Sequence, residues 1–291
     1  MKIGTHEVGP GHPTFIVAEG GSNHGGSLEA ALALTDAAAD AGANAMKWQL
    51  WLSADEMYDR EQFPTEWASA DRWRLPVEWL PALRDRAHER GMAFGLSSFG
   101  FASLDEADKW VDFHKVASIE GGWREFVHAV YDKKKPVIVS SGMRGPEDKL
   151  FIDLAVPTVW MQCTVAYPAT LSEVDLRVLT RWPKDDARLP LIGYSDHTTH
   201  PTIAPCAAVA LGACVIEKHL RLYGYPVGVT GMFRLNEAPD WPHSLPLSQF
   251  AEMVLAIRMT EQALGSSEKR IRKSEEPYLK YRRGPRGLRG S

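Results

Sequence analysis

The chain has 291 residues, of which 44% are hydrophobic, so it can build one large core or two small ones. A formal net charge of −4 gives no reason to expect nucleic acid or an anionic membrane as a partner. We expect a cytoplasmic protein for three reasons. The cysteines are odd in number and have no paired spacing, the N-terminus lacks the apolar core of a signal peptide, and no apolar run is long enough to span a membrane.

Short apolar runs of strand character alternate with longer amphipathic runs along almost the whole chain. Eight strands are predicted, at Thr14–Ala18, Ala45–Gln49, Ala93–Ser98, Phe113–Ser118, Pro136–Ser141, Thr158–Cys163, Leu189–Tyr194 and Ala213–Glu217. Helices are predicted at Leu28–Ala41, Val77–Arg90, Leu104–Trp110, Arg124–Asp132, Pro146–Leu154, Leu171–Arg181, Ile203–Leu211 and Leu247–Leu264. Because strand–helix alternation implies parallel strands with right-handed crossovers, eight unbroken repeats favour a closed (β/α)8 TIM barrel over an open sheet.

Glycine and serine residues mark several of the predicted helix ends. Gly42 and Gly91 follow helices where glycine favours termination, while Ser27, Ser103 and Ser172 occupy positions where an N-cap is expected. These signals support the helix boundaries given above.

Several segments lie outside the strand–helix repeat. Lys2–Val8 is expected to form a small hairpin at the bottom of the barrel. Trp51–Leu75 and Leu222–Pro246 are insertions after strands two and eight, so they would lie at the C-terminal face of the strands, where barrel active sites form. We expect a barrel domain at 1–265 and a basic C-terminal tail at 266–291, which has nine Lys and Arg against three Glu. The tail is either a solvated end or an arm that reaches a neighbouring subunit.

Two histidines end successive predicted strands. His197 closes Gly-Tyr-Ser-Asp-His and His219 closes Val-Ile-Glu-Lys-His, with a helix-length span between them. In a β-α-β unit both strand ends reach the same edge of the sheet, where two neutral imidazoles could hold a divalent metal beside Asp196 and Glu217. A lone histidine more often caps a strand or bonds locally, but a matched pair beside carboxylates favours the metal site.

Two lysines, Lys47 and Lys115, lie inside otherwise apolar strands, and serines stand at several neighbouring strand ends. Ammonium groups and hydroxyls facing one pocket suit a small ligand that carries both a phosphate and a carboxylate. The alternative is that each lysine reaches the surface along its apolar stem. Glu19 is a candidate general acid or base, or a charge at a helix N-terminus. The glycine-rich turn that follows it lacks the spacing of a dinucleotide-binding fingerprint.

Eight short motifs follow one another along the strand ends. They are Ala-Glu-x-Gly-x-Asn-His-x-Gly at 18–26, Lys-x-Gln at 47–49, Ser-Ser at 97–98, Lys-x-Ala-Ser at 115–118, Ser-Ser-Gly-Met at 140–143, Cys-Thr-x-x-Tyr-Pro at 163–168, Gly-Tyr-Ser-Asp-His-Thr at 193–198 and Glu-Lys-His at 217–219. In this order they resemble the sialic acid synthase (N-acetylneuraminate synthase) family, and they cover essentially the whole predicted barrel.

The resemblance implies a phosphoenolpyruvate-dependent condensing synthase, a transferase that forms a carbon–carbon bond. The enol carbon of phosphoenolpyruvate would attack the aldehyde of a sugar, and phosphate would leave by C–O cleavage to give a 2-keto-3-deoxy sugar acid. The implied partners are these two small molecules and a second copy of the chain in a homodimer, without nucleic acid or membrane.

The resemblance also implies roles for individual residues. It assigns a divalent metal, usually Mn²⁺ with Mg²⁺ or Co²⁺ as alternatives, to His197 and His219. It assigns phosphoenolpyruvate binding to Lys47, Gln49, Ser98, Lys115, Ser118, Ser140 and Ser195. It places Glu19, Tyr167 and Glu217 as catalytic groups facing the acceptor or the metal water.

Three departures from the family pattern concern the acceptor sugar. The stretch Tyr225–Thr230 lacks the aspartate of the family's Pro-Gly-Pro-Asp, and Val165 stands where the family often has asparagine. The sequence also ends without the C-terminal antifreeze-like domain, which in the family lends an arginine to the partner's acceptor site. We therefore expect an acceptor that need not be N-acetylmannosamine, and one of the arginines in the basic tail could supply the missing group.

Two other classes of function are compatible with such a barrel. One is a metal-dependent sugar epimerase, isomerase or aldolase, which would not depend on phosphoenolpyruvate. The other is a non-catalytic sugar-binding relative. The joint presence of acid, lysine and histidine residues at the strand ends argues against a non-catalytic relative, because a decayed site would lose some of them.

Overall fold

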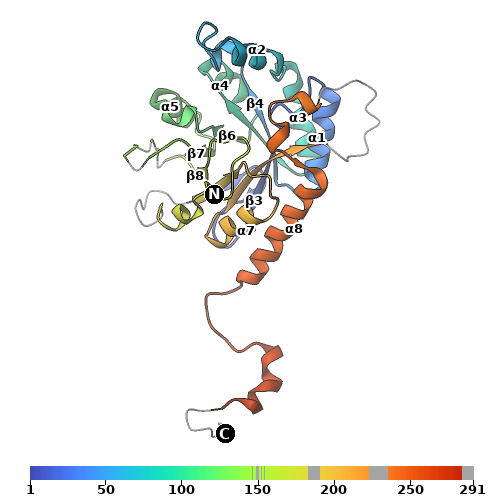
Figure 1. The fold of residues 1–291 in the computed structure, drawn as a ribbon, viewed down its shortest axis with the longest axis vertical. Helices are drawn as coiled ribbons and strands as arrows, with labels where there is room; N and C mark the ends of the chain where they lie inside the picture. The colour runs from blue at the N-terminus through green and yellow to red at the C-terminus, as the bar shows by residue number, and fades with distance from the viewer. Residues whose placement is uncertain are drawn as a thin grey trace.

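The computed structural model describes residues 1–145, 147–148, 151, 153, 155–182, 191–222 and 235–283. Its eight barrel strands are β3 (Phe15–Glu19), β4 (Ala45–Leu50), β5 (Ala93–Ser98), β6 (Phe113–Val116), β7 (Val137–Ser140), β8 (Thr158–Cys163), β9 (Leu191–Asp196) and β10 (Val215–Arg221). All pair in parallel, and β10 pairs with both β9 and β3, which closes the sheet. The predicted (β/α)8 barrel is confirmed, and each predicted strand has its counterpart (Figure 1).

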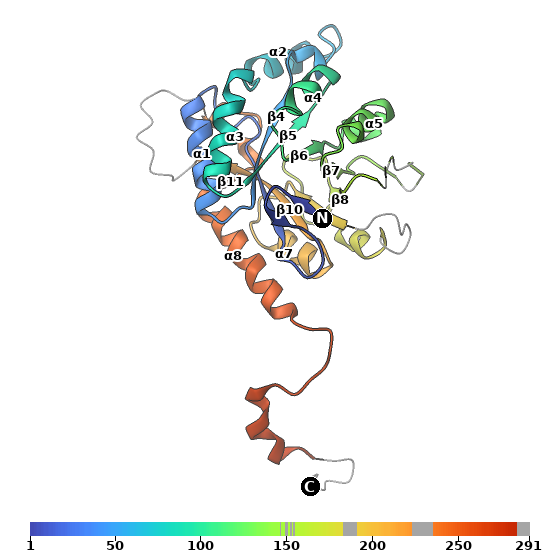
Figure 2. The same cartoon turned by 180° about the vertical axis from the view of Figure 1, so that it is seen from behind.

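Helices lie around the outside of the barrel (Figures 1 and 2). The α-helices are α1 (Leu28–Asp40), α2 (Pro64–Arg72), α3 (Leu80–Glu89), α4 (Phe101–Ala107), α5 (Arg124–Asp132), α7 (Ile203–Ala210) and α8 (Leu247–Leu264). The 3₁₀ helices are η1 (Ala54–Glu56), η2 (Val77–Trp79), η3 (Glu120–Gly122), η4 (Leu176–Thr180), η5 (Leu235–Glu237), η6 (Trp241–His243) and η7 (Lys273–Tyr281). None of the helices in the described part of the chain is long and apolar enough to cross a membrane.

Two short pairings complete the sheet structure. β1 (Lys2–Ile3) and β2 (His6–Glu7) form the predicted hairpin, and Ile3 packs against the inner side chains at the N-terminal end of the barrel. β11 (Leu245–Pro246) pairs in parallel with the end of β10, so it ties the start of α8 to the C-terminal face.

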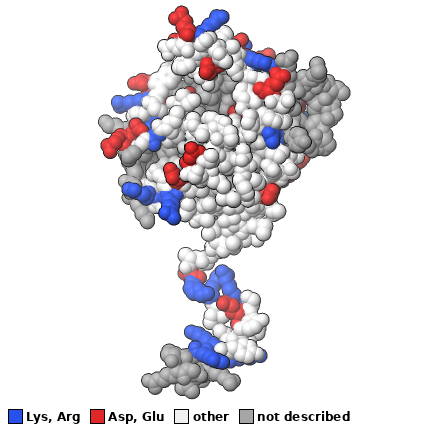
Figure 3. Space-filling model, viewed as in Figure 1, with Lys and Arg blue, Asp and Glu red and all other residues white. Residues whose placement is uncertain are grey.

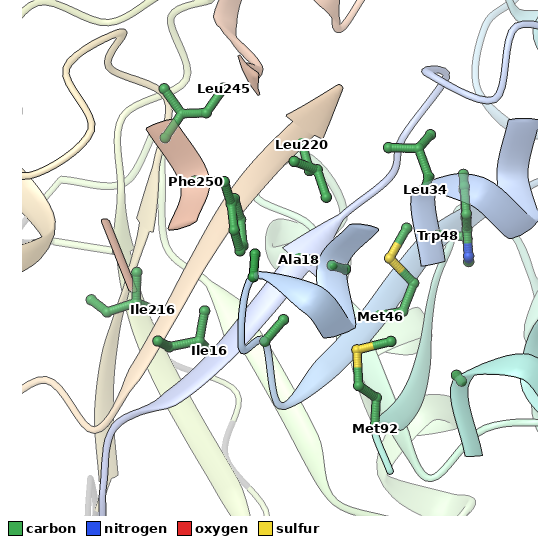
Figure 4. Close-up of a cluster of buried hydrophobic side chains, with 14 of the residues drawn as sticks. Ile16, Ala18, Leu34, Met46, Trp48, Met92, Ile216, Leu220, Leu245 and Phe250 are labelled. Atoms are coloured by element: carbon green, nitrogen blue, oxygen red, sulfur yellow. The ribbon is translucent and has the colours of Figure 1, made fainter. Parts of the chain in front are cut away.

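Strand alternation divides the barrel side chains into two sets. Phe15 and Val17 of β3 point inward, where they join a buried cluster that fills the lower half of the barrel. Ile16 and Ala18 point outward into a second cluster, which also receives Leu34 of α1 and Phe250 of α8 (Figure 4). Because inward positions recur every second residue, the next inward residue of β3 is Glu19, at the C-terminal edge.

The ends of α1 and α3 follow the sequence signals closely. Gly42 and Gly91 have φ values of +87° and +75°, a left-handed conformation that glycine adopts without a Cβ penalty. Each glycine N–H and the N–H that follows it bond to carbonyls of the preceding turn, as in a Schellman motif. Ser27 caps α1, because its hydroxyl accepts a hydrogen bond from the Ala30 N–H.

Other local predictions were wrong in detail. Ser103 is not the N-cap of α4: the helix begins at Phe101, and the Ser103 hydroxyl accepts from the N–H of Gly100 instead. Ser172 starts no helix, because Asp175 adopts φ +43° and only the 3₁₀ helix η4 follows. The helix predicted at Pro146–Leu154 lies largely outside the described residues, and α2, inside the first insertion, was not predicted.

Beyond Leu264, where α8 ends, the chain runs away from the barrel through residues 265–283 (Figures 1 and 2). The side chains of this segment are exposed. Figure 3 shows lysines and arginines distributed along it, in keeping with its basic composition.

Packing inside the barrel leaves no room for a side chain at Gly95, so a larger residue there should lower the stability of the fold. A Cβ added there would lie 2.2 Å from the ring of Phe113 on the neighbouring strand. Gly95→Ala should therefore lower the free energy of unfolding by about 1–3 kcal/mol, measured by urea denaturation. Phe113→Leu is the matched control, and adding it to Gly95→Ala should recover part of the loss. Strictly additive effects of the two substitutions would contradict this packing.

Candidate active site and metal centre

A buried charge cluster lies where the barrel strands end. The ammonium group of Lys47 contacts the carboxylate of Glu19, donates to Ser97 Oγ at 2.8 Å and lies 3.7 Å from Glu217 Oε2. Lys115 lies 3.8 Å from the other oxygen of Glu217. Both lysines and both carboxylates are buried, so neither lysine reaches the surface.

Hydroxyl and backbone groups complete the surroundings of Lys115 and Glu217. Lys115 Nζ donates to Ser140 Oγ at 2.7 Å and to the carbonyl of its neighbour Val116 at 3.1 Å. Ser195 donates to Glu217 Oε1 at 2.9 Å. Burial alone would raise the pKa of Glu217, but the charges of Lys115 and Lys47 outweigh it, and the pKa lies below its usual range. Glu217 is therefore a carboxylate at neutral pH.

The two predicted metal-binding histidines lie together at the ends of β9 and β10, with ring centres 5.7 Å apart. His197 Nδ1 lies 2.8 Å from the carbonyl oxygen of Thr164, so Nδ1 carries the proton and Nε2 keeps a free lone pair. Burial lowers the pKa of His197 to about 4 and also lowers that of His219 well below its usual value. Both imidazoles are therefore neutral at pH 7, the form that binds metals.

Sequence reasoning missed two residues at this centre, Asp240 and His243, which lie in the second insertion. Nitrogen and oxygen ligand atoms of His219, Asp240 and His243 all lie within 4.8 Å of one another. Asp240 Oδ2 accepts hydrogen bonds from the backbone N–H and the hydroxyl of Ser22, at 2.7 and 2.6 Å. The spacing Asp-x-x-His in the insertion after the eighth strand was a usable signal, but it does not lie at a strand end.

Asp240 also brings a carboxylate to the site from a position that the sequence analysis did not consider. The stretch Tyr225–Thr230, which lacks an acid, lies outside the described residues, whereas Asp240 brings a carboxylate to the site from further along the same insertion. The first turn after β3 makes room for it, since a Cβ at Gly21 would come within 2.4 Å of Asp240 Oδ2.

The donor set fits a divalent transition-metal ion. Neutral imidazole nitrogens bind divalent first-row transition ions, and a carboxylate nearby adds an oxygen donor. His219 Nδ1 and both ring nitrogens of His243 are buried without a hydrogen-bond partner among the described residues. Buried polar atoms are rarely left unpaired, so a ligand for them is expected.

Asp196 does not belong to the metal centre, contrary to the expectation from its place beside His197. Its carboxylate faces outward from the barrel, where it accepts from Lys218 Nζ at 2.7 Å and from the Tyr194 hydroxyl at 2.9 Å. The Lys218 ammonium also contacts the carbonyl of Thr198. This fully buried pair holds the ends of β9 and β10 together from outside.

Of the other candidate residues, some face the interior of the barrel and some face away from it. Ser98 points out of the barrel and donates to the carbonyl of Ser103 at 3.4 Å, while its neighbour Ser97, which the prediction left out, contacts Lys47. Gln49 lies on the inward face of β4, two residues beyond Lys47 and paired in register with Ser97. The roles assigned to Ser98 and Gln49 stay predictions.

Two further candidates border the cluster on the β7 and β8 side. Ser118 accepts a hydrogen bond from the N–H of Gly142 at 3.1 Å. The ring of Tyr167 lies 4.3 Å from that of His197, centre to centre, and is half exposed. Ser118 therefore lies beside the loop after β7, and Tyr167 lies beside the candidate metal ligand His197.

The two insertions meet over this face of the barrel. Arg72 in α2 forms a 2.7 Å ion pair with Glu237 in η5. The first insertion is also tied to the turn after β3, because His24 Nε2 lies 3.2 Å from the carbonyl oxygen of Trp73 while Nδ1 accepts from the Gly26 N–H. Burial lowers the pKa of His24 to about 4, which keeps this link neutral.

Glu120 lies just beyond Ser118, and its burial should make the stability of the folded protein depend on pH. Burial raises the pKa of Glu120 to about 7 against the opposing charge of Lys115. Between the unfolded value near 4.5 and pH 7 the folded state binds more protons than the unfolded one, so stability falls as pH rises through this window. Glu120→Gln removes the titration, so at pH 8 it should be more stable than the parent by up to about 3 kcal/mol, with little difference at pH 5.

Urea denaturation at the two pH values measures this effect, with the exposed Glu252→Gln as the control. An equal change at pH 5 and pH 8 would show that Glu120 does not titrate in this window.

Comparisons with known proteins show which family the chain resembles over most of its length. A family model described as the NeuB family matches residues 34–269. The spore coat polysaccharide biosynthesis protein SpsE of Bacillus subtilis is 34% identical over 91% of this chain and 72% of that protein. Pseudaminic acid synthase of Campylobacter jejuni is 32% identical over 100% of this chain and 85% of that protein. The crystal structure of N-acetylneuraminic acid synthetase from Leptospira borgpetersenii, in complex with citrate, is similar with a TM-score of 0.83 and 26% identity, over 98% of this chain and 97% of that one.

Proposed function

The chain belongs to the NeuB family, and from that premise we propose how its strand-end site carries out the condensation. It is a carbon–carbon bond-forming transferase of the sialic acid synthase type. Phosphoenolpyruvate is joined to a sugar, phosphate is released, and the product is a 2-keto-3-deoxy sugar acid. The observation that carries the proposal is the pair of buried, inward-facing lysines beside two neutral imidazoles.

Lys47 and Lys115 would bind the phosphate and the carboxylate of phosphoenolpyruvate. Both ammonium groups are buried, and each already has a serine hydroxyl, Ser97 or Ser140, at hydrogen-bond distance. Serine hydroxyls add directed donors to the two positive charges. A buried lysine requires anionic partners, and this ligand brings two anionic groups on a three-carbon frame.

His197 and His219 would hold the divalent ion, for which Mn²⁺ is our candidate. When bound there, such an ion supplies Lewis-acid polarisation of the aldehyde oxygen of the acceptor. Tyr167 borders His197 and Asp240 borders His219, so both would contact the hydroxyl groups of the acceptor.

The reaction also needs groups that move protons. When the enol carbon bonds to the aldehyde carbon, the aldehyde oxygen gains a proton. Water then adds at the phosphate-bearing carbon, and one of its protons balances the proton that the aldehyde oxygen has gained. The C–O bond to phosphate breaks, the second proton of the water leaves with the phosphate, and the carbon becomes the keto group. Glu217 is a carboxylate at neutral pH and would accept the proton from water. Glu19, fixed by the Gly21 N–H at 2.6 Å and by Lys47, would orient that lysine at the ligand.

The acceptor is proposed to be an aldehyde sugar that need not be N-acetylmannosamine. Val165, beside the loop after β7, offers no hydrogen bond where the family often has asparagine. Asp240 supplies an acid on the other side of the site. The acceptor side of the site thus combines the carboxylate of Asp240 with the apolar side chain of Val165.

The direct test is to incubate the protein with phosphoenolpyruvate, Mn²⁺ and a panel of aldoses, N-acyl hexosamines and their 6-phosphates. A metal-dependent product with the mass of acceptor plus pyruvyl unit, released together with phosphate, is expected in mass spectrometry. Absence of product and of any thermal protection by phosphoenolpyruvate would sink the proposal in favour of an isomerase or a sugar-binding protein.

Replacing Lys115 by methionine should weaken phosphoenolpyruvate binding by about 10- to 100-fold, because a charge-assisted contact is lost from a buried site. Isothermal titration without acceptor measures this change. Lys109→Met, which removes an exposed lysine paired with Glu106, is the matched control and should leave affinity unchanged. Equal affinity of both variants would show that the ligand binds elsewhere.

We further propose that residues 1–265 form the barrel domain and that residues 266–291 are a separate tail. The described part of the tail is exposed, and its hydrogen bonds, such as Arg272 N–H to Glu275, are internal. Truncation after Gly265 should leave the melting temperature within about 2 °C of the parent. Light scattering on the same pair shows whether the tail contributes to the expected homodimer, and a loss of turnover on truncation would identify it as an arm that completes the acceptor site.

A further inference from the structure

Among the described residues at the candidate metal centre, His243 is used neither by the motifs nor by the proposed chemistry. It ends η6 in the second insertion and is only 2% exposed. Both of its ring nitrogens are buried and lack a hydrogen-bond partner among the residues that the structure describes. An imidazole buried in this way loses its hydration without compensation, so something must occupy at least one nitrogen.

The neighbours of His243 are the other candidate ligands. Its ring centre lies 4.5 Å from that of His219 and 5.9 Å from that of His197. Its Nε2 atom lies 3.4 Å from Asp240 Oδ1, too far for a good hydrogen bond without rearrangement. The remaining close ring belongs to Tyr167, at 4.9 Å.

These separations fit three imidazoles around one ion. An imidazole nitrogen lies roughly 2.1 Å from a bound ion and its ring centre about 1 Å further, so rings on one ion have centres roughly 4.5–5.5 Å apart. The observed separations of 4.5, 5.7 and 5.9 Å lie at or just beyond that range. We infer that His243 is a third imidazole ligand of the divalent ion proposed for His197 and His219.

The loop that carries His243 is fixed in place from both sides. Ser244 Oγ donates to the carbonyl of Asp240 at 2.5 Å and accepts from Asn23 Nδ2 at 2.7 Å, which ties the loop to the turn after β3. On the other side, the Arg221 guanidinium donates to the carbonyl of Trp241 at 2.8 Å. Such anchoring at the end of β10 holds the imidazole ready for an ion and limits the reorganisation that binding requires.

A third nitrogen ligand has a consequence for metal selection. An added imidazole ligand favours first-row transition ions over Mg²⁺, because Mg²⁺ prefers oxygen ligands and dehydrates reluctantly. The structure therefore assigns to this chain a site that discriminates against Mg²⁺ through His243. This inference rests on the proposed function, because it concerns the same ion.

The test counts imidazoles directly on the full-length protein loaded with Mn²⁺. Electron spin echo envelope modulation should report three coordinated imidazole nitrogens in the parent protein and two in His243→Ala. Titration followed by the free-ion signal should show Mn²⁺ affinity reduced about 10-fold or more in His243→Ala. His128→Ala, which removes an exposed histidine of α5, is the control and should match the parent.

Two coordinated imidazoles in the parent protein would overturn the inference while leaving the proposed function intact. This outcome does not depend on whether His243→Ala folds. Unchanged Mn²⁺ affinity in a folded His243→Ala would also overturn it. Failure of the parent to bind Mn²⁺ at all would instead remove the metal half of the proposed function, and the inference with it.

Discussion

The carboxylate of Glu217, held between Lys47 and Lys115 inside the barrel, is the interaction on which the rest of the site depends. It places two ammonium groups within 4 Å of one carboxylate, and all three side chains are buried. A buried charge is tolerated only when it is paired, so the strands that carry these residues must keep their register. Two residues further along β10, the same face presents His219, which joins the charge cluster to the metal centre.

Charge balance links the lysine and carboxylate cluster to the imidazoles of His197 and His219. Two lysines and two carboxylates, Glu19 and Glu217, carry no net charge together, whereas phosphoenolpyruvate would add two to three negative charges. The imidazoles nearby are neutral, so they contribute no compensation of their own. A divalent ion at those imidazoles would supply the missing positive charge, and binding of the ion and of the ligand should therefore favour each other.

The sequence alone predicted the barrel and most of its inward-facing strand-end residues, because period-two alternation and apolar strands specify which residues line the interior. It was harder to predict which of two neighbouring strand residues faces the interior, because a shift of one residue moves a side chain to the other face. Ser97 rather than Ser98 faces Lys47, and Asp196 faces outward to Lys218. Asp240 and His243 were missed for a different reason. They lie in a long insertion without strand periodicity, and only its contacts with Ser22 and Asn23 bring it back to the barrel.

The central claim is that the lysine cluster and the imidazole cluster form one site whose charges are completed by the metal ion. The most direct measurement is the dissociation constant of phosphoenolpyruvate with and without Mn²⁺, by calorimetry, in the parent protein and in a His197→Ala, His219→Ala double variant. Mn²⁺ should tighten binding about 5- to 150-fold in the parent and not in the double variant, which also corrects for ion pairing in solution. Equal affinity with and without Mn²⁺ in the parent would contradict it.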